Sequence, residues 1–589
     1  MNPAIALLLL GLLAADSALA AGNLTAGAHP HKDCQHHEEE EEEDSALRDR
    51  AAQRVGWIRP GPIANAQSWL HVKILGINDF HGQLSTGRRL GSRPVGGAAV
   101  LASYLNTAQA QVNNHAVIVH AGDHVGASPA ASALLQDEPS ISFLNLLGNA
   151  HCDVADRADP RCNLVGTLGN HEFDEGKVEM LRLLQGGNHA LGPFLENPYR
   201  GASFPYVSAN VVDAQTGLPV LPPYIIKQVR GMPIAFIGAV LKQTPSIVTP
   251  TGVAGLLFLD EADSINRYIP ELQAQHVRAI VVLIHQGARQ IGGVVSGEIA
   301  NIVMRLDDEV DVVMSGHAHS FTNTLLKNQN DKEILVTQAF SAGTAYADID
   351  VEIDRASKDI VQKSARIVTT YGDAGAGLTP DAEVAALVAQ AEQTVAPLVN
   401  RVIGTAAANI TRSQNSAGES ALGNLIADAQ RAAMGTDFAF MNPGGIRADI
   451  DSGPLTWGEL FTVQPFGNSL VKMELSGQQI YDLLNQQWLN QPFPRMLQVS
   501  GLAYTWDNAR PVGDRIIEVR QNGMPINRAS VYTLTANSFI AAGGDNFTLF
   551  TQGVNVVGGA IDLDALIQFV GGLAQPFSAA VEGRTTRLH

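Results

Sequence analysis

The sequence has few basic residues for its length. Its 589 residues include 39 lysines and arginines against 58 aspartates and glutamates, which gives a formal net charge of -19. Binding to a nucleic-acid backbone needs clustered basic side chains that neutralise phosphates. We therefore do not expect a nucleic-acid polymer as a partner. Part of the negative charge comes from one run, Glu38 to Glu43 with Asp44, so the folded part is less acidic than the total suggests.

Long apolar segments are also scarce. The exception is 1–20, where an apolar core from Ala4 to Leu13 precedes the small-x-small sequence Ala18-Leu19-Ala20. This pattern is typical of a signal peptide cleaved before Ala21. A buried segment that stays on the chain is the alternative, because the amino-terminal region lacks Lys and Arg. No other run is long enough to span a bilayer, so we expect export to the periplasm or the extracellular space without a membrane anchor.

Cysteine occurs three times. Cys152 and Cys162 lie close together in a polar stretch and could form a disulfide, which an exported protein can retain. Two free thiols are the alternative, because spacing alone does not determine pairing. Cys34 is left over.

Residues 21–68 show no periodic apolar pattern. They combine the acidic run with His29, His31, His36 and His37. This composition is typical of a disordered leader. A leader that collects metal ions is the alternative to a solvated charged tail.

Between Trp69 and about 370, short apolar runs alternate with longer helical stretches, which predicts α/β layering in a first domain over 69–370. The predicted strands are Val72 to Ile77, Ala116 to Val119, Ile234 to Gly238, Ala279 to Ile284 and Val310 to Met314. The predicted helices include Gly97 to Ala110 and Asp260 to Gln275.

Apolar residues at helical spacing predict one long helix from Asp381 to Val399, so we interpret 371–400 as a linker between domains. A second, smaller α/β domain is predicted over 401–589. Its helices are expected at Ser420 to Met434 and Ser476 to Leu489, and its strands at Phe438 to Met441 and Val531 to Ala536.

Five glycine-containing turns of the first domain carry side chains that can bind metal ions. They are Asn78-Asp79-Phe80-His81-Gly82, Gly122-Asp123-His124-Val125-Gly126, Gly169-Asn170-His171-Glu172-Phe173-Asp174, His285-Gln286-Gly287 and Gly316-His317-Ala318-His319. Four of the five follow an apolar strand-like run, so their side chains are expected past the carboxyl ends of neighbouring strands, where α/β sheets place their sites. One such turn is a weak signal, but five in this order predict a metal centre.

These turns together resemble the calcineurin-like metallophosphoesterases. With the second-domain segment Asn442-Pro443-Gly444-Gly445-Ile446-Arg447, the chain resembles the secreted 5′-nucleotidase family, which includes bacterial UDP-sugar hydrolases and 2′,3′-cyclic-nucleotide phosphodiesterases. The resemblance covers roughly Val72 to Phe550. It implies a four-layer metallophosphoesterase sandwich of α/β (α+β) class, joined by the long helix to a smaller α/β substrate-binding domain.

The resemblance also implies a site for two divalent metal ions. One ion would be held by Asp79, His81 and His319, the other by Asn170, His285 and His317, with Asp123 bridging them. Imidazole nitrogens mixed with carboxylates suit Zn, Mn or Fe better than Ca. Two such ions lower the pKa of a bound water and neutralise the charge that grows as the ester bond breaks. The expected reaction is attack of a metal-bound hydroxide on phosphorus.

His171 and Asp174 are the catalytic pair that the resemblance implies. His171 adjoins the ligand Asn170, so its imidazolium could stabilise the transition state or protonate the leaving oxygen. Asp174 could orient that ring and raise its pKa. The alternative for Asp174 is a helix N-cap.

The second domain carries the residues expected to bind the nucleotide. In the family, two aromatic rings sandwich the base, and the matching residues are Phe466 and Phe539; burial in the core is the alternative for each. Asn442 would reach the base edge, Arg447 the ribose or phosphate, and Asp545 the ribose hydroxyls. Asn546 departs from the family pattern, which commonly has Gly after the aspartate.

The expected function is therefore removal of the 5′-phosphate from nucleoside monophosphates by an exported metal-dependent hydrolase. Activity on 2′,3′-cyclic nucleotides or UDP-sugars is compatible with the same residues. One alternative keeps the two metals but changes the substrate, as in the thiosulfohydrolases of sulfur oxidation. Another is a periplasmic metal-binding protein that acts through its His- and Glu-rich leader.

Overall fold

The computed structural model describes residues 54–56, 68–113, 115–491 and 493–589. The predicted signal peptide, Cys34 and most of the predicted leader lie outside these residues. Val55–Gly56 form a short strand, β1, that pairs antiparallel with β19 (Ile360–Thr369). The prediction of a disordered leader is therefore wrong at these two residues.

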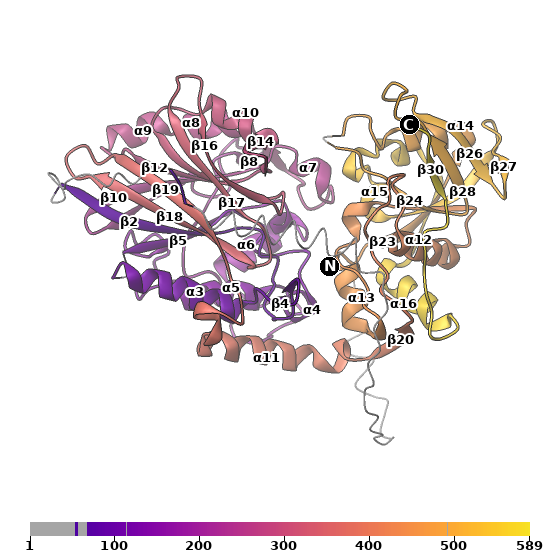
Figure 1. Cartoon of the computed structure of the whole chain (residues 1–589), viewed down its shortest axis with the longest axis horizontal. Coiled ribbons are helices and arrows are strands. Elements are labelled where there is room, and N and C mark those ends of the chain that lie inside the picture. Colours follow the sequence, from indigo (N-terminus) through magenta and orange to yellow (C-terminus); the bar gives the residue numbers. More distant parts are fainter. Residues whose placement is uncertain (1–53, 57–67, 114, 492) are drawn as a thin grey trace, which may run out of the picture.

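Two sheets form the middle of the first domain (Figure 1). The first contains, in spatial order, β1, β19, β18 (Ala345–Asp354), β2 (Trp69–Ile77), β5 (Ala116–His120), β6 (Leu164–Thr167) and β7 (Tyr206–Val207). The second contains β16 (Phe321–Lys327), β17 (Glu333–Ala339), β15 (Val310–Met314), β12 (Ala279–His285), β10 (Met232–Val240) and β9 (Tyr224–Val229). The neighbours β2, β5, β6 and β7 run parallel, as do β10, β12, β15 and β17.

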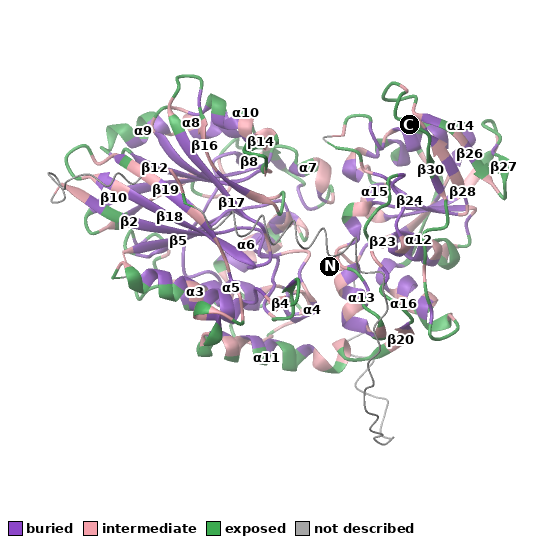
Figure 2. Cartoon of the chain, viewed as in Figure 1, coloured by how far each residue is buried: buried purple, intermediate pink, exposed green. Residues whose placement is uncertain are grey.

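Three apolar clusters join these sheets and their helices into four layers. Val72 and Ile74 of the first sheet pack against Phe236 and Val281 of the second, and these strands are coloured as buried in Figure 2. The first sheet's other face is covered by α3 (Ala98–Gln111), α5 (Glu138–Leu147), α6 (Lys177–Gln185) and α11 (Ala382–Val399). The second sheet's other face is covered by α8 (Glu261–Asn266), α9 (Ile269–Ala274) and α10 (Glu298–Arg305). The predicted four-layer sandwich is confirmed.

The predicted helix from Asp260 to Gln275 is two helices, α8 and α9. Pro270 lies in the first turn of α9, where its missing N–H costs nothing. The same residue could not donate within a continuous helix, so the chain restarts there. At the other end, Asp260 caps α8 by accepting a hydrogen bond from Asp263 N.

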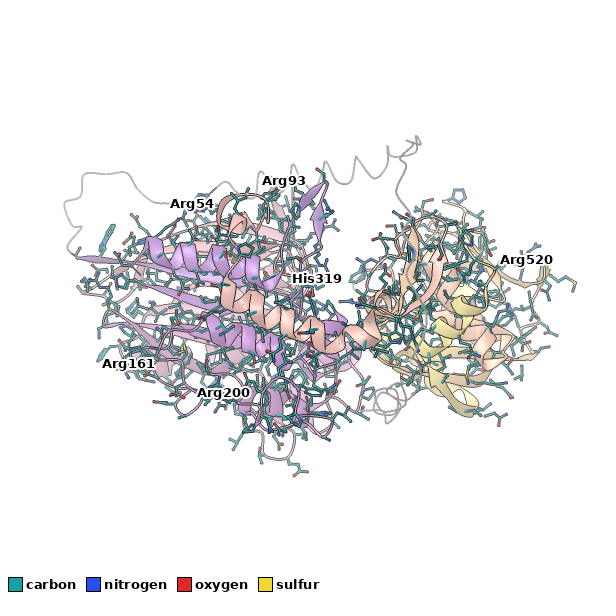
Figure 3. The ribbon with its side chains drawn as sticks, turned by 90° about the horizontal axis from the view of Figure 1, so that it is seen from below. Arg54, Arg93, Arg161, Arg200, His319 and Arg520 are labelled. Atoms are coloured by element: carbon teal, nitrogen blue, oxygen red, sulfur yellow. A yellow bond between two sulfur atoms is a disulfide. The ribbon has the colours of Figure 1, made fainter. Side chains whose placement is uncertain are left out.

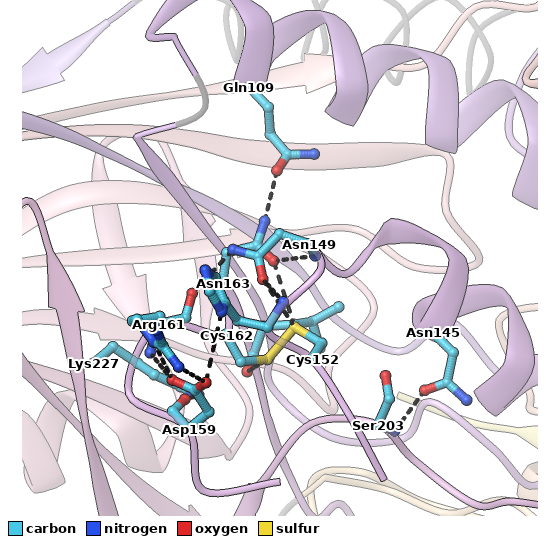
Figure 4. The surroundings of a disulfide bond; sticks show 12 residues. Gln109, Asn145, Asn149, Cys152, Asp159, Arg161, Cys162, Asn163, Ser203 and Lys227 are labelled. Carbon is cyan, nitrogen blue, oxygen red and sulfur yellow. Dashed lines mark hydrogen bonds and ion pairs between the residues drawn. A yellow bond between two sulfur atoms is a disulfide. The ribbon is translucent and has the colours of Figure 1, made fainter. Parts of the chain in front are cut away.

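Shorter elements complete the first domain. They are β3 (Arg89–Leu90), β4 (Arg93–Pro94), α4 (Ala130–Ala133), η2 (His171–Phe173), β8 (Val211–Asp213), α7 (Thr244–Ile247), β11 (Leu256–Phe258), β13 (Arg289–Ile291), β14 (Val294–Ser296) and η3 (Gly375–Leu378). Cys152 and Cys162 form a disulfide, with an S–S distance of 2.15 Å. Figure 4 shows its loop beside Lys227 of β9, whose Nζ donates to Asp159 O.

The predicted long helix is present as α11. Asp381 caps it, because its carboxylate accepts from Glu383 N and Val384 N. Its apolar stripe, which includes Val384 and Val388, packs on the helical layer of the first domain, whereas the opposite side is exposed in Figure 2. This helix is therefore anchored to the first domain.

The second domain has a five-stranded sheet and a smaller four-stranded one. The larger contains β24 (Gln498–Ser500), β21 (Phe438–Met441), β28 (Val531–Asn537), β23 (Ser469–Ser476) and β29 (Val554–Ile561). The smaller contains β27 (Met524–Pro525), β26 (Ile516–Gln521), β25 (Ala503–Trp506) and β30 (Thr585–Arg587), and β20 (Val402–Ala406) pairs with β22 (Gly453–Thr456).

Helices and turns surround these sheets. They are α12 (Ala421–Met434), η4 (Pro443–Gly445), α13 (Trp457–Val463), α14 (Gly477–Asn485), α15 (Ser538–Ala541), η5 (Gly544–Asn546), η6 (Thr548–Gln552) and α16 (Asp562–Gly572). The first domain meets this one where Ala130 of α4 packs among the apolar side chains of α13, and where α7 contacts η5. Within the described residues, no helix is long and apolar enough to cross a membrane.

Candidate metal and substrate site

The five predicted turns converge at one edge of the two sheets. Three follow the neighbouring strands β2, β5 and β6, and two follow the neighbouring strands β12 and β15. The turn at Gly169 also follows a strand, Leu164–Thr167, which the sequence pattern did not identify because the strand is only four residues long. Figure 3 labels His319 on the side of the first domain that faces the second.

The backbone of these turns is unusual. Asp79, His81, Asp123, His317 and His319 all have positive φ, between 48° and 74°. Residues with a Cβ rarely adopt this region, and each such residue costs about 1 to 3 kcal/mol. Because the conformation recurs at five predicted ligands, the turns are shaped to direct side chains rather than to minimise strain.

Asp79, His81 and His319 form one group of possible ligands. Their closest atoms are His81 Nε2 and His319 Nε2, 3.0 Å apart, and His319 Nε2 lies 3.5 Å from Asp79 Oδ1. His81 Nδ1 is 2.8 Å from Gly126 O, so Nδ1 carries the proton and leaves Nε2 as a lone-pair donor.

Asp123, His285 and His317 form the second group. His285 Nε2 lies 2.9 Å from Asp123 Oδ2, and its Nδ1 lies 2.7 Å from Ala121 O. Asp123 Oδ2 is also 3.8 Å from His81 Nε2 of the first group. The carboxylate of Asp123 therefore stands between the two groups, as expected for the predicted bridge.

Asn170 completes the predicted set. Its side-chain oxygen is buried and has no hydrogen-bond partner in the described part of the chain. A buried amide oxygen without a partner is costly, and a cation would satisfy it. Nitrogen and oxygen donors from seven side chains also match the preferences of Zn, Mn or Fe. The residues present therefore fit two divalent ions.

Burial controls the charges in this cluster. It raises the pKa of Asp79 to about 7 and lowers the pKa of His81 and of His317 to about 3, so these imidazoles are neutral near pH 7. Burial opposes ionisation of Asp123 as well, but His285 and His171 hold the pKa of that carboxyl well below its usual value. Burial lowers the pKa of His285, but the charge of Asp123 outweighs it and raises that pKa to about 9. Neutral imidazoles and ionised carboxylates bind metal ions, so His285 would have to release its proton to a bound ion.

His171 lies beside this cluster and contacts Asp174, as predicted. Its Nδ1 is 2.7 Å from Asp174 Oδ2, and its backbone N–H donates to Asp123 Oδ1 at 2.8 Å. Burial would lower the pKa of His171, but the charges of Asp174 and Asp123 outweigh it and raise that pKa. Asp174 thus orients the ring and favours its protonated form.

Glu172 is a residue of this site that the sequence reasoning did not single out. Its buried carboxylate accepts from Asp123 N at 3.0 Å, His124 N at 2.9 Å and Gly169 N at 2.5 Å. It therefore ties the turn of Asp123 to the turn of Asn170. A Cβ at Gly169 would collide with Asp123, which explains the glycine. Spacing gave no signal for Glu172, because its partners are backbone N–H groups, two of them in another turn.

Asn78 has a similar positioning role at the first group. Its Nδ2 donates to Asp79 Oδ2 and to Phe340 O, both at 2.6 Å, and its Oδ1 accepts from Ala339 N at 2.8 Å. The amide fixes Asp79 against the end of β17.

Two of the predicted substrate residues of the second domain lie at the metal cluster. The ring of Phe466 stacks on His171, with centroids 5.8 Å apart and planes 17° apart. The Arg447 guanidinium lies 5.7 Å from the centre of the same ring. Its charge interacts with Asp123, Asp174 and Asp79, although burial lowers the pKa of Arg447. The alternative of a core position for Phe466 is not what the structure has, because this ring is only partly buried.

The other three predicted residues lie together in the second domain. Asn442 Nδ2 donates to Asp545 Oδ2 at 2.9 Å, and Asn537 Nδ2 donates to Asn442 Oδ1 at 2.9 Å. The partly buried ring of Phe539 lies against Gly544, next to Asp545. Asn546 has a φ of 61°. Asparagine tolerates this left-handed conformation, so it can stand where the family commonly has glycine.

Comparison with known proteins assigns both halves of the chain. Residues 72–321 match the calcineurin-like phosphoesterase family, and residues 402–552 match the 5′-nucleotidase C-terminal domain. The solved 5′-nucleotidase precursor from Thermus thermophilus superposes with a TM-score of 0.74 and 29% identity, covering 88% of this chain and 99% of that one.

Two bacterial relatives are closer in sequence. The endonuclease YhcR of Bacillus subtilis is 38% identical over 88% of this chain, which spans only 41% of that protein's length. The cell wall protein Lmo0130 of Listeria monocytogenes is 36% identical over 85% of this chain and 67% of its own length. Similarity therefore extends across both domains.

Replacing Glu172 with Gln tests how these turns are held together. The amide keeps the size of the side chain but offers one acceptor in place of two, so it cannot serve three backbone N–H groups. We expect affinity for Zn²⁺ or Mn²⁺ to fall about 10- to 100-fold, as for other groups that support metal ligands. Titration against a chelating indicator measures this change. Unchanged affinity, equal to that of the control Glu392→Gln on the exposed side of α11, would contradict the assigned role.

Proposed function

Because the chain belongs to the 5′-nucleotidase family of calcineurin-like metallophosphoesterases, we propose that it removes the 5′-phosphate from nucleoside monophosphates. It is a phosphoester hydrolase, and the nucleotide substrate is the proposal. The observation that carries it is the position of Phe466 and Arg447 at the histidine and carboxylate cluster. A ring for the base and a cation for the phosphate thereby stand next to the reacting centre.

Two divalent cations would be held by the seven predicted ligands: Asp79, His81 and His319 around one, Asn170, His285 and His317 around the other, with Asp123 shared. When bound, they supply charge that holds the phosphoryl oxygens and activates water. The strained turns, the hydrogen bond that Asn78 donates to Asp79 and the hydrogen bonds that Glu172 accepts from backbone N–H groups would orient these side chains.

His171 would act on the phosphate itself. With Nδ1 engaged by Asp174, its Nε2 is the nitrogen left for a substrate oxygen. A protonated Nε2 can donate to the developing charge or protonate the leaving O5′. Arg447 supports the same step, because its guanidinium can bind two phosphoryl oxygens at once.

The second domain would bind the nucleoside. Phe466 and Phe539 offer faces for the base, and the Asn442–Asp545 pair offers acceptors for ribose hydroxyls. In the described structure the ring of Phe466 stacks on His171, so a nucleotide would have to separate the Phe466 ring from the His171 ring. The same pocket is compatible with 2′,3′-cyclic nucleotides and UDP-sugars.

Export to the periplasm or the extracellular space is part of this proposal, and so is the exclusion of nucleic-acid polymers. The printed name of one relative is an endonuclease, which makes an oligonucleotide a necessary member of any substrate panel. The thiosulfohydrolase alternative shares the metal residues with this proposal. It differs because its substrate has no base that could stack on Phe466 and Phe539. The leader-based metal-binding alternative concerns residues outside those that the structure describes.

A substrate panel tests the proposed function. We expect the purified full-length chain to release phosphate from AMP, to lose this activity after dialysis against a chelator, and to regain it with Zn²⁺, Mn²⁺ or Fe²⁺. The panel includes UDP-glucose, 2′,3′-cyclic AMP, a single-stranded oligonucleotide and thiosulfate-derived substrates. The proposal is wrong if no nucleotide releases phosphate in a metal-dependent way. If only the oligonucleotide is cleaved, the substrate is an oligonucleotide and not a nucleoside monophosphate.

Replacing His171 with Gln tests the proton donor. General acid catalysis contributes about 10²- to 10⁴-fold, so kcat for AMP should fall by that factor while metal content stays unchanged. Asp174→Asn should cause a smaller loss of the same kind. His276→Asn is the control, because this exposed histidine precedes β12 at the strand end opposite His285. A His171→Gln enzyme with wild-type kcat would exclude the role.

Replacing Phe466 or Phe539 with Ala tests the base pocket. Stacking on an aromatic ring is worth about 1 to 3 kcal/mol per base, so KM for AMP should rise about 5- to 100-fold for each variant. KM for ribose 5-phosphate, which has no base, should change little and serves as the internal control. If neither variant alters nucleotide turnover, the pocket is assigned wrongly and a substrate without a base is favoured.

A further inference from the structure

Arg495 is a largely buried cation next to the nucleotide pocket that the proposed function does not use. It follows α14 in the chain and lies just before β24. Its Nε is 3.6 Å from Asp545 Oδ1, and its side chain is only 12% exposed.

The guanidinium of Arg495 is held but not saturated. Its Nη1 donates to Gln491 Oε1 at 2.8 Å, whereas Nε and Asp545 Oδ1 are too far apart for a hydrogen bond. Arginine has five N–H donors. Among the described residues, the others have no hydrogen-bond acceptor, so the group can bind an oxyanion.

Gln491 fixes the geometry of this group. Its Nε2 donates to Asp545 O at 2.7 Å while its Oε1 accepts from Arg495. One amide therefore connects the cation to the backbone of the residue proposed to bind ribose. The Phe493 ring, with its centre 5.0 Å from the guanidinium carbon, supports the other side.

The position beside Asp545 suggests what Arg495 would recognise. Asp545 suits a ribose that carries free hydroxyls, because a carboxylate accepts hydrogen bonds. A phosphate on one of those hydroxyls would be repelled by Asp545 unless a cation stood beside it. In dinucleotide-binding proteins, an acid recognises a free ribose hydroxyl, and an Arg recognises the phosphate where that hydroxyl is phosphorylated.

We propose that Arg495 binds a phosphate carried on the 2′ or 3′ oxygen of the ribose, so that the preferred substrates carry phosphates both there and at the 5′ position. This inference rests on the proposed function. Water would cleave the bond between phosphorus and O5′, which yields inorganic phosphate and a nucleoside that keeps its ribose phosphate. Arg495 is a specificity residue that makes no contact with the reacting bond.

The test compares Arg495→Gln with the wild-type chain on AMP and on adenosine 3′,5′-bisphosphate. A hydrogen bond to a charged group contributes about 1.5 to 3 kcal/mol, so kcat/KM for the bisphosphate should fall about 10- to 100-fold more than kcat/KM for AMP. Arg495→Lys keeps the charge and should recover part of the preference. Arg510→Gln, which removes an exposed arginine paired with Asp514, is the matched control.

A binding experiment separates this inference from the proposed hydrolysis. Calorimetry in the presence of a chelator compares adenosine 3′-phosphate, adenosine 2′-phosphate and adenosine. The wild-type chain should bind at least one phosphate more tightly than adenosine, and Arg495→Gln should abolish the difference. If AMP is not hydrolysed but this difference is found, the proposed function fails and the role of Arg495 stands.

A third substrate distinguishes the two molecules that could carry the ribose phosphate, a free nucleotide and the 5′ end of an oligonucleotide. A 5′-phosphorylated dinucleotide carries a diester on its 3′ oxygen, whereas the bisphosphate carries a monoester. Dependence on Arg495 for the dinucleotide indicates the 5′ end of an oligonucleotide, and dependence for the bisphosphate alone indicates a free nucleotide. Equal losses on AMP and on both other substrates, or no difference between adenosine and its phosphates, would overturn the proposal.

Discussion

Two buried carboxylates, Asp79 and Asp123, impose the constraint on which the rest of the structure depends. Among the described residues, neither has a lysine or arginine within ion-pair distance; their charged neighbours are histidines. A buried anion is costly unless positive charge or hydrogen-bond donors surround it. The chain provides backbone N–H groups from His317 and His171, and the imidazole of His285, whose pKa burial would lower but the charge of Asp123 raises to about 9. Divalent cations would compensate the negative charge that remains.

This constraint also explains why the turns are strained. Left-handed backbone at five ligands is tolerated because the core of four layers and the hydrogen bonds of Glu172 and Asn78 hold each turn in place. The strain is local, and the folding free energy that offsets it comes from the apolar packing between the two sheets. Ligand geometry is therefore set before any cation or substrate binds.

The sequence predicted the parts of this arrangement that have a local signal. The apolar strand runs, the long helix from Asp381 to Val399 and the five turns with Asp, Asn and His were all predicted, and the four-layer fold followed from a family resemblance. The break between α8 and α9 was missed because Pro270 is compatible with the start of a helix as well as with its interruption. Glu172 was missed because its partners are backbone groups, and Arg495 was missed because Asp545 lies far away in the chain, which no spacing rule reveals.

The contact between Phe466 and His171 also joins residues far apart in the chain, so the sequence could not reveal it. It shows how the two domains together could determine specificity. The predicted metal ligands come from one domain and the ring that contacts the proposed catalytic histidine comes from the other, so the proposed function requires the two domains to meet. The helix α11 is anchored to the first domain, and α4 and α7 provide further contacts with the second. Since the proposed nucleoside pocket is built from turns such as Gly544–Asn546, we expect substitutions there to change the substrate while the buried carboxylates keep their arrangement.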